Sequence, residues 1–335
     1  MSTSGDDRLH TRLGRTALRV SRVCLGTVNF GGRVEEPEAR ELLDYAVDSG
    51  INFVDTANIY GWREYKGYTE EVIGRWLASR PSLRDGVVLA TKVGNAMREG
   101  INEQGLSARH IVAACEASLR RLGTEWIDLY QMHHVDRDAG WDEVWQAMEL
   151  LVQQGKVRYV GSSNFAGWNL AAAQEAANAR NFLGVVSEQC LYNLTVRHPE
   201  LELLPAARAY GVAVLPWSPL HGGLLSGVLR KTAEGRAVKS GQGRSAAVLE
   251  RMRGTIERYE RLCADFGRDP AEVGLAWVMA RPGVTSTVIG PRTPSHVKDA
   301  LQALESPLSD RETALLEELF PPIGRGGAAP DAWLT

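Results

Sequence analysis

The chain has 335 residues, of which 44% are hydrophobic, so it is long enough to bury a full core. Its 38 basic and 41 acidic residues give a net charge of −3, which gives no support for binding to nucleic acid or to an anionic membrane. We therefore expect a small-molecule partner.

Strand-like and helix-like segments alternate from about residue 20 to residue 305. A short hairpin is expected first, over residues 9–20. Eight apolar segments are strand candidates: 21–26, 51–55, 87–92, 127–132, 157–162, 185–189, 212–217 and 285–290. Amphipathic segments of three or more helical turns lie between them, such as 36–49, 69–79, 107–121, 140–154 and 167–180. One long irregular stretch, 218–244, follows the seventh strand.

This eightfold alternation predicts the α/β class and a (β/α)8 TIM barrel. Continuous apolar strands such as 212–215 are typical of parallel strands that helices cover on both faces. No linker divides the chain, so we expect a single domain over residues 1–335, with a core of about 9–320 and loose termini. Ser107 is placed to cap a helix start, and Gly50, Gly155 and Gly211 to end the helices before three strands.

Four cysteines lie far apart and form no CxxC pair: Cys24, Cys115, Cys190 and Cys263. This spacing indicates neither a disulfide framework nor a zinc ribbon, so we expect reduced thiols and no metal site. The first residues lack an apolar signal segment, and no apolar run approaches the roughly 20 residues of a membrane span. We expect a cytoplasmic protein; the sequence predicts no oligomeric state.

Four polar residues follow the ends of three consecutive strand candidates. Asp55 and Lys92 each close a strand, His133 follows the next one, and Tyr60 lies five residues beyond Asp55. The active site of such a barrel lies at the carboxyl ends of its strands, so these side chains are expected to converge.

The four residue types fit proton delivery to a carbonyl group. Tyrosine is a weak acid at neutral pH, but a nearby ammonium such as that of Lys92 stabilises the phenolate. Asp55 would hold Lys92 in place and charged, and His133 would hydrogen-bond a carbonyl oxygen. A different use of the same barrel is a class I aldolase, in which Lys92 forms a Schiff base.

Reduction of a carbonyl needs a hydride donor such as a nicotinamide. The chain has no GxGxxG motif after its first strand, which argues against a Rossmann dehydrogenase. Instead, it resembles the aldo-keto reductases over nearly its whole length. The motifs that carry the resemblance are Asp55-Thr-Ala-Asn-Ile-Tyr60, Thr91-Lys92, Asp128-Leu-Tyr-Gln-Met-His133, Gly161-Ser-Ser-Asn164, Gln189, Trp217-Ser-Pro-Leu220 and Ile289-Gly290.

The resemblance implies a role for each of the four polar residues. Tyr60 is the general acid, Lys92 and Asp55 adjust it, and His133 orients the carbonyl. Strand alternation does not choose between His133 and His134, but the family motif selects His133. His134 then borders the substrate pocket.

The resemblance also implies an NADP(H) site. Ser163, Asn164 and Gln189 are expected to bind the nicotinamide carboxamide, and Trp217 to stack on its ring. Arg292 is placed to meet the 2′-phosphate, which favours NADPH over NADH. His296 and Ala300 depart from the usual pattern near the adenine. The other expected cofactor-binding residues are Gly26, Thr27, Asp55, Ser218, Pro219, Leu220, Gly222, Ile289, Gly290 and His296.

Two segments indicate what kind of substrate the protein binds: the loop after the second strand and the stretch 227–244. Trp62 and Tyr65 follow Tyr60 closely, and aromatic faces near cations suit a sugar or nucleotide that carries phosphate. The stretch 227–244 would cover the cofactor pyrophosphate, a substrate diphosphate, or neither. Its cations are Arg230, Lys231, Arg236, Lys239 and Arg244.

Three longer segments resemble actinobacterial nucleotide-deoxyhexose reductases of macrolide sugar biosynthesis, in the mycarose-type branch: 60–71, 190–201 and 220–226. This resemblance implies antibiotic biosynthesis and C3-ketoreduction of a dTDP-3,4-diketo-2,6-dideoxyhexose. Three alternatives stay open. They are 2,3-enoyl reduction of a nucleotide sugar, broad aldehyde and ketone reduction, and an NADP-binding regulatory subunit without enzymatic activity.

Overall fold

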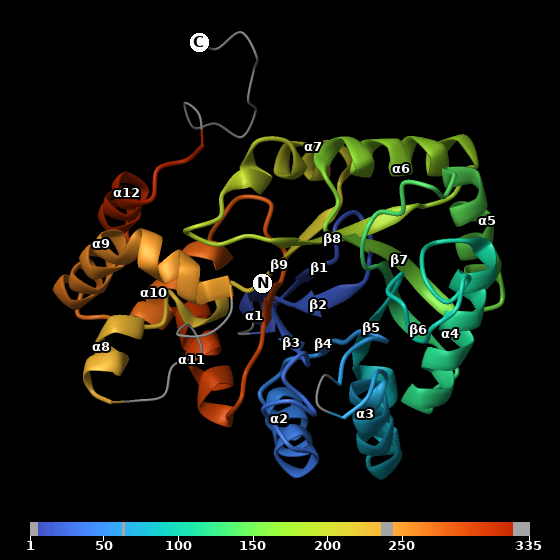
Figure 1. Ribbon diagram of the computed structural model, residues 1–335, viewed down its shortest axis with the longest axis horizontal. Helices are drawn as coiled ribbons and strands as arrows, with labels where there is room; N and C mark the ends of the chain where they lie inside the picture. The colour runs from blue at the N-terminus through green and yellow to red at the C-terminus, as the bar shows by residue number, and fades with distance from the viewer. Residues whose placement is uncertain (1–5, 62–63, 236–243, 324–335) are drawn as a thin grey trace, which may run out of the picture.

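The computed structural model describes residues 6–61, 64–235 and 244–323, and the side chains of residues 6, 7 and 244 are not described. Eight parallel strands close into a barrel in the order β10-β3-β4-β5-β6-β7-β8-β9 (Figure 1). They are β3 Val23–Gly26, β4 Phe53–Asp55, β5 Val88–Val93, β6 Ile127–Met132, β7 Val157–Ser163, β8 Val185–Leu191, β9 Ala213–Trp217 and β10 Thr287–Ile289. The predicted (β/α)8 barrel is confirmed.

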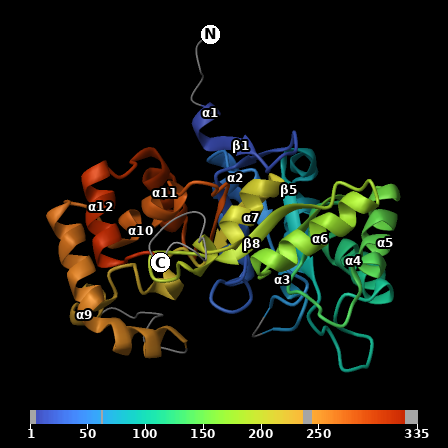
Figure 2. The same cartoon turned by 90° about the horizontal axis from the view of Figure 1, so that it is seen from above.

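Helices surround this barrel (Figures 1 and 2). Those that follow barrel strands are α2 Glu36–Asp48, α3 Tyr68–Ser79, α4 Ala108–Leu122, α5 Trp141–Gln153, α6 Gly167–Ala179, α7 Leu203–Tyr210, α8 Val228–Ala233, α9 Arg244–Asp265, α10 Pro270–Met279 and α11 Pro294–Glu305. A short α1 Asp6–Leu9 precedes the barrel, and α12 Asp310–Leu319 follows it and lies beside α9. Short 3-10 helices span η1 Pro81–Gly86, η2 His198–Glu200 and η3 His221–Gly223.

The expected hairpin closes the amino-terminal end of the barrel. Strands β1 His10–Arg12 and β2 Arg19–Ser21 pair antiparallel. Leu13, at the turn, is buried in the cluster of apolar side chains inside the barrel. The Arg15 amide donates to the Gly211 carbonyl, just before β9, at 2.8 Å. The opposite, carboxyl end is therefore the open mouth.

Helix ends lie where the sequence predicts them. The Ser107 hydroxyl accepts a hydrogen bond from the His110 amide at the start of α4. Gly50, Gly155 and Gly211 follow α2, α5 and α7 with φ of 87°, 71° and 64°. A left-handed backbone of this kind ends a helix and suits glycine, which has no Cβ.

Some local predictions need correction. Strands β3, β4 and β10 start at Val23, Phe53 and Thr287, each two residues later than predicted. Ser21 pairs with His10 in the hairpin instead, and the Asn52 side chain bonds that hairpin at Ser21 and Arg19. The stretch 218–244 is not wholly irregular. It contains η3 and α8, whose first amides, from Leu229 and Arg230, donate to Glu260 of α9.

Within the described residues, no helix combines the length and the apolar content needed to cross a membrane. The four cysteines are buried as free thiols. No group of three metal-binding side chains occurs in this part of the chain.

Candidate active site

The structure brings the four predicted polar residues together at the mouth of the barrel. Asp55 is the last residue of β4, and Lys92 lies near the end of the neighbouring β5. His133 follows β6 directly, and its amide donates to the Val93 carbonyl at 2.8 Å. Tyr60 approaches from the β4–α3 loop, where its ring centroid lies 6.0 Å from that of His133.

Lys92 and Asp55 form a buried ion pair. Lys92 Nζ donates to Asp55 Oδ2 at 2.6 Å and to the Thr56 carbonyl at 2.8 Å. The Lys92 and Asp55 side chains are only 0% and 3% exposed, so water competes little with their attraction. Because one charge is balanced by the other, the pair is tolerated in the barrel interior.

Two amides that face the barrel interior hold the second oxygen of Asp55. Gln131 Nε2 and Gln189 Nε2 donate to Oδ1 at 2.9 and 2.8 Å. No role is predicted for Gln131 from the sequence, although a glutamine inside a buried strand is a signal for one. The carboxylate therefore has partners on both oxygens, and its orientation toward Lys92 is fixed.

Lys92 remains protonated despite its burial. Burial lowers the pKa of Lys92, but the charges of Asp55 and Tyr60 and the hydrogen bond that Lys92 donates to Asp55 outweigh it, so the pKa is raised overall. A Schiff base requires a neutral amine, so this environment argues against the aldolase alternative.

Tyr60 is the group that this ammonium faces. Lys92 Nζ lies 5.2 Å from the centroid of the Tyr60 ring. Burial raises the pKa of Tyr60 above its ordinary value, and Asp55 adds to that rise, while Lys92 lowers it as the sequence analysis expects. Burial is the largest of these effects, so Tyr60 keeps its proton at neutral pH.

His133 is held neutral. Burial lowers the pKa of His133 to about 2, and the positive charge of Lys92 and the neighbouring His134 act in the same direction. The two imidazoles stack with an interplanar angle of 2° and a centroid distance of 5.0 Å. His133 Nδ1 lies 2.8 Å from the amide nitrogen of Asn95, a residue that the sequence analysis does not identify.

The residues expected to bind the carboxamide form one hydrogen-bonded group. Asn164 Nδ2 donates to the His133 carbonyl and to Ser163 Oγ, both at 3.0 Å, and Asn164 Oδ1 accepts from Trp217 Nε1 at 3.2 Å. Ser163 Oγ donates to the Gln189 carbonyl at 2.8 Å. Asn164 has φ of 60°, a left-handed conformation that asparagine tolerates better than most residues.

A buried glutamate supports this group from the outer side of the strands. Glu188 accepts from the Phe165 amide at 3.0 Å and from the Ser162 hydroxyl, so it holds the turn that carries Asn164. Burial raises the pKa of Glu188 from 4.5 to about 8. No role is predicted for Glu188 from the sequence, although an acidic residue in the middle of a strand expected to be buried is a signal for one.

The segment after β9 has a backbone suited to an anion. Ser218, His221, Gly222 and Gly223 all have positive φ, and the Gly222 amide donates to Ser218 Oγ at 3.0 Å. Gly222 has φ of 63°, a left-handed backbone that favours glycine. Closely spaced turns of this kind present backbone N–H groups to phosphate oxygens, which fits the pyrophosphate expected beside Pro219 and Leu220.

The expected adenosine end lies where β10 leads into α11. The Arg292 amide donates to Nδ1 of His296 at 3.1 Å, and both residues are exposed. Ala300 is buried, so it offers no surface to adenine. Asn29 Nδ2 donates to the Gly290 carbonyl at 2.8 Å, and this contact ties the end of β10 to the loop after β3.

Gly26 and Thr27, at the end of β3, contact the neighbouring strands β10 and β4. A Cβ on Gly26 would lie 2.7 Å from the Ile289 carbonyl oxygen, so glycine lets β3 approach β10. The Thr27 hydroxyl donates to the Asp55 carbonyl at 3.0 Å and is fully buried. These contacts place both residues beside the tetrad without leaving the Thr27 hydroxyl free for a ligand.

Of the expected substrate residues, the structure describes Tyr65 and His134. Tyr65 is 51% exposed, and its hydroxyl donates to Glu71 at 2.6 Å. His134 is exposed beside His133. Trp62 lies outside the described residues.

Of the five cations in the stretch 227–244, the structure describes the side chains of two. Arg230 forms an ion pair with Asp269 at 2.9 Å, and Lys231 donates to the Ser226 carbonyl. Arg236, Lys239 and the side chain of Arg244 lie outside the described part of the chain. For Arg230 and Lys231, the expected phosphate contact therefore has a competing partner within the protein.

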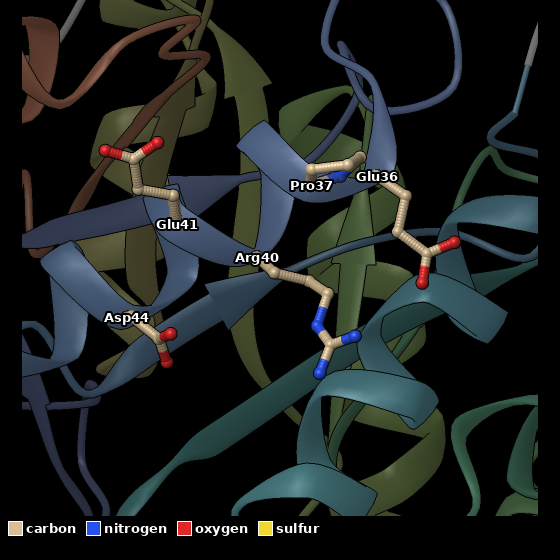
Figure 3. A pocket seen from close by; sticks show the side chains of 5 residues that line it. All are labelled: Glu36, Pro37, Arg40, Glu41 and Asp44. Atoms are coloured by element: carbon tan, nitrogen blue, oxygen red, sulfur yellow. The ribbon is translucent and has the colours of Figure 1, made fainter.

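A surface hollow elsewhere is not a competing site. Figure 3 shows this hollow on the outer side of the barrel, where side chains of one helix, α2, line it: Glu36, Pro37, Arg40, Glu41 and Asp44. Glu36 and Asp44 are occupied by ion pairs with Arg75 and Arg80. These ion pairs hold α2 against α3 and its carboxyl end, on the outer side of the barrel.

The fold and the mouth of the barrel define an α/β-barrel enzyme of the oxidoreductase class. The chain belongs to the aldo/keto reductase family, whose model matches residues 22–320. Members of this family typically use a nicotinamide cofactor, NAD(P)H, which agrees with the hydrogen-bonded amide group around Asn164.

Comparison with known proteins agrees with this assignment. The chain is 47% identical over 329 residues to "Uncharacterized oxidoreductase YrpG" of Bacillus subtilis. The aligned region covers 97% of this chain and 99% of the Bacillus protein. It is 31% identical to "Versiconal hemiacetal acetate reductase" of Aspergillus parasiticus, covering 93% and 97% of the two chains. It is also 30% identical to "Probable voltage-gated potassium channel subunit beta" of Oryza sativa subsp. japonica, covering 88% and 91%.

Proposed function

We propose that the protein is an NADPH-dependent carbonyl reductase in which Tyr60 gives the proton. The observation that carries this proposal is the buried Lys92–Asp55 ion pair directly beneath the Tyr60 ring. The nicotinamide, when bound, supplies a hydride to the carbonyl carbon. The carbonyl oxygen then gains negative charge, and Tyr60 Oη protonates it.

Each of the other three residues of the tetrad assists this proton transfer. Lys92 stabilises the phenolate that remains after Tyr60 has given up its proton. Asp55 keeps Lys92 charged and oriented. His133, neutral and beside Tyr60, donates a hydrogen bond to the carbonyl oxygen and aligns it with Tyr60 Oη.

The side-chain amides of Asn164 and Gln189 are suited to bind the nicotinamide carboxamide. Asn164 Nδ2 already donates twice, but Oδ1 keeps a second lone pair for a carboxamide N–H. Gln189 Nε2 makes one short bond to Asp55 and one long contact of 3.4 Å with Gln131, which a carboxamide oxygen would replace. Trp217, fixed at its Nε1, would offer a ring face to the nicotinamide.

Replacement of Tyr60 by phenylalanine tests the mechanism. Tyr60→Phe keeps the ring but removes the proton donor, so turnover is expected to fall by about two orders of magnitude or more. NADPH affinity, measured by fluorescence titration, is expected to stay unchanged. Tyr45→Phe, on α2, is the matched control and should keep full activity. Normal turnover of Tyr60→Phe would remove Tyr60 from the role of acid.

For the substrate, we propose a dTDP-3,4-diketo-2,6-dideoxyhexose that is reduced at C3, as in deoxysugar and antibiotic biosynthesis. Its support is the resemblance of residues 60–71, 190–201 and 220–226 to nucleotide-deoxyhexose reductases, and the exposed ring of Tyr65, five residues after Tyr60 in the chain. Exposed aromatic rings suit stacking against sugar or base faces.

Broad reduction of aldehydes and ketones is a second candidate. It is favoured by the relative from Aspergillus, which is named for the reduction of a hemiacetal acetate rather than of a nucleotide sugar. The name of the rice relative raises a regulatory role without turnover, and measurable turnover by this chain would argue against that role.

One assay separates these substrates. Oxidation of NADPH is measured with enzymatically generated dTDP-3,4-diketo sugar and, in parallel, with a panel of simple aldehydes. With NADPH deuterated at C4, ketoreduction puts deuterium on a carbinol carbon at C3, whereas enoyl reduction puts it on a carbon that bears no oxygen. Equal kcat/KM for the sugar and the aldehydes would contradict the sugar proposal and favour broad reduction.

A further inference from the structure

Asn95 contacts the ring of His133 at its Nδ1 atom. It lies in the β5–α4 loop, three residues after Lys92, and its Nδ2 is 2.8 Å from His133 Nδ1. Backbone hydrogen bonds fix the chain next to both residues. The His133 amide donates to Val93, and the Gly105 amide donates to Gly94, the residue before Asn95, at 2.8 Å.

The neutral His133 ring carries one proton, on either Nδ1 or Nε2. An imidazole nitrogen without a proton accepts a hydrogen bond, and a protonated one donates. Within the described residues, no side chain hydrogen-bonds Nε2, so the proton position depends on what faces Nδ1. An asparagine NH2 group at 2.8 Å is satisfied only if Nδ1 carries the lone pair.

We propose that Asn95 is a positioning residue that donates to His133 Nδ1 and keeps the ring proton on Nε2, where it can donate to the carbonyl oxygen of the substrate. This inference rests on the proposed role of His133. The opposite amide orientation would put Oδ1 against an Nδ1–H group, and a bare Nε2 lone pair would then repel the carbonyl oxygen.

An amide suits this position better than a carboxylate. Asparagine is neutral, so it directs the proton without stabilising the charged imidazolium. Burial, Lys92 and His134 also disfavour the imidazolium. An aspartate has nearly the same shape as asparagine but can only accept, so it would draw a proton onto Nδ1.

The first test is NMR of enzyme labelled with ¹⁵N-histidine, in which the two nitrogens of His133 report the tautomer directly. His133→Asn assigns the signals. We expect the Nε2–H tautomer in the native enzyme, and Nδ1–H or the imidazolium in Asn95→Asp. A native Nδ1–H tautomer, or no change in Asn95→Asp, would overturn the inference.

The second test is kinetic and uses a simple aldehyde, so it does not depend on the sugar proposal. Asn95→Asp should lower kcat about 10- to 100-fold while NADPH affinity stays unchanged. Asn95→Ala, expected to give mixed tautomers and a smaller loss, replaces it if Asn95→Asp does not fold. Asn102→Ala is the matched control, because it changes an exposed asparagine of the same loop.

A double-mutant cycle shows whether Asn95 acts through His133. In a His133→Ala background, Asn95→Asp should cause no further loss, whereas an equal further loss would contradict the inference. If His133→Ala retains full turnover, the proposed role of His133 fails. The NMR result would still decide whether Asn95 sets the tautomer.

Discussion

Asp55 keeps Lys92 charged within the barrel, so its removal should change how activity depends on pH. In Asp55→Asn, burial is no longer opposed by a carboxylate, and the pKa of Lys92 should fall. Lys92 then loses its proton at a lower pH than in the native enzyme, and activity should decline as pH rises through that lowered value. We also expect turnover to fall about 100-fold near neutral pH.

Profiles of kcat/KM from about pH 6 to about pH 10 check this prediction. Asp44→Asn is the control, because Asp44 pairs with Arg80 at the surface and is 43% exposed. Loss of this exposed pair should leave the profile unchanged, because solvent screens it. An Asp55→Asn profile that matched the native one would show that Asp55 does not set the charge of Lys92.

Arg292 is predicted to choose between the two nicotinamide cofactors. Its guanidinium would contact the 2′-phosphate that NADPH carries and NADH lacks. Arg292→Ala should therefore weaken NADPH binding about 10- to 100-fold and NADH binding little, as measured by fluorescence titration. Arg311→Ala, on exposed α12, is the control. Equal losses for both cofactors would exclude this role.

The sequence leads to the four tetrad residues because each stands at the end of an apolar strand, where a barrel places its active site. Their hydrogen-bonding partners are harder to predict. Gln131 reaches Asp55, and Asn95 reaches His133, only because β4, β5 and β6 pair in one register and one loop turns back. The register of the strands and the path of the β5–α4 loop depend on how the whole barrel packs. The residues of one strand or loop alone do not determine them.

At the scale of elements, the closure of β3 against β10 depends on a glycine. A Cβ on Gly26 would lie 2.7 Å from the Ile289 carbonyl oxygen and 2.8 Å from Val288 Cγ1. Gly26→Ala should therefore force the strands apart and lower the free energy of unfolding by about 1–3 kcal/mol. Chemical denaturation measures this change.

Gly254 in α9 is the matched control. A Cβ there meets nothing within 4 Å, and the position is exposed. Because alanine favours a helix more than glycine does, Gly254→Ala should stabilise the protein by up to about 1 kcal/mol. Opposite signs for the two variants would show that contact with β10, rather than loss of glycine in general, causes the destabilisation. Equal stability of Gly26→Ala and the native protein would contradict the prediction.

Periodicity predicts the elements well where each is long and flanked by glycine or a cap, as for α4 between Ser107 and Gly123. It is less accurate at strand ends, as before β4, where Asn52 lies outside the strand and its side chain bonds the hairpin. It also fails in 218–244, where α8 is short and its first amides depend on Glu260, far along the chain. Short helices of this kind are stabilised by tertiary contacts rather than by their own sequence.

For the whole molecule, eight alternating segments are enough to predict a closed barrel, because parallel strands with helical crossovers leave few other arrangements. The apolar segments also predict that the barrel has an apolar core, but they do not show which polar groups this core encloses. Glu188 is the clearest case, since it is fully buried without an ion-pair partner among the described residues.

Glu188 should make the stability of the whole protein fall as pH rises. Its pKa is about 8 in the folded protein and near 4.5 when exposed, so between these values the folded state holds a proton that the unfolded state has lost. Unfolding then releases a proton, and the free energy of unfolding decreases with pH. At about 1.4 kcal/mol per pH unit, the loss reaches about 5 kcal/mol by pH 8 and then levels off.

Urea denaturation at several pH values, with native protein and Glu188→Gln, measures this slope. Glutamine does not titrate, so the variant should lose the decrease between about pH 4.5 and about pH 8. Glu149→Gln is the control with the opposite sign, because Arg180 lowers the pKa of Glu149 and its contribution disappears only as pH falls. If Glu188→Gln kept the native slope, Glu188 would be ionised in the folded protein, and the turn that carries Asn164 would rest on a buried negative charge.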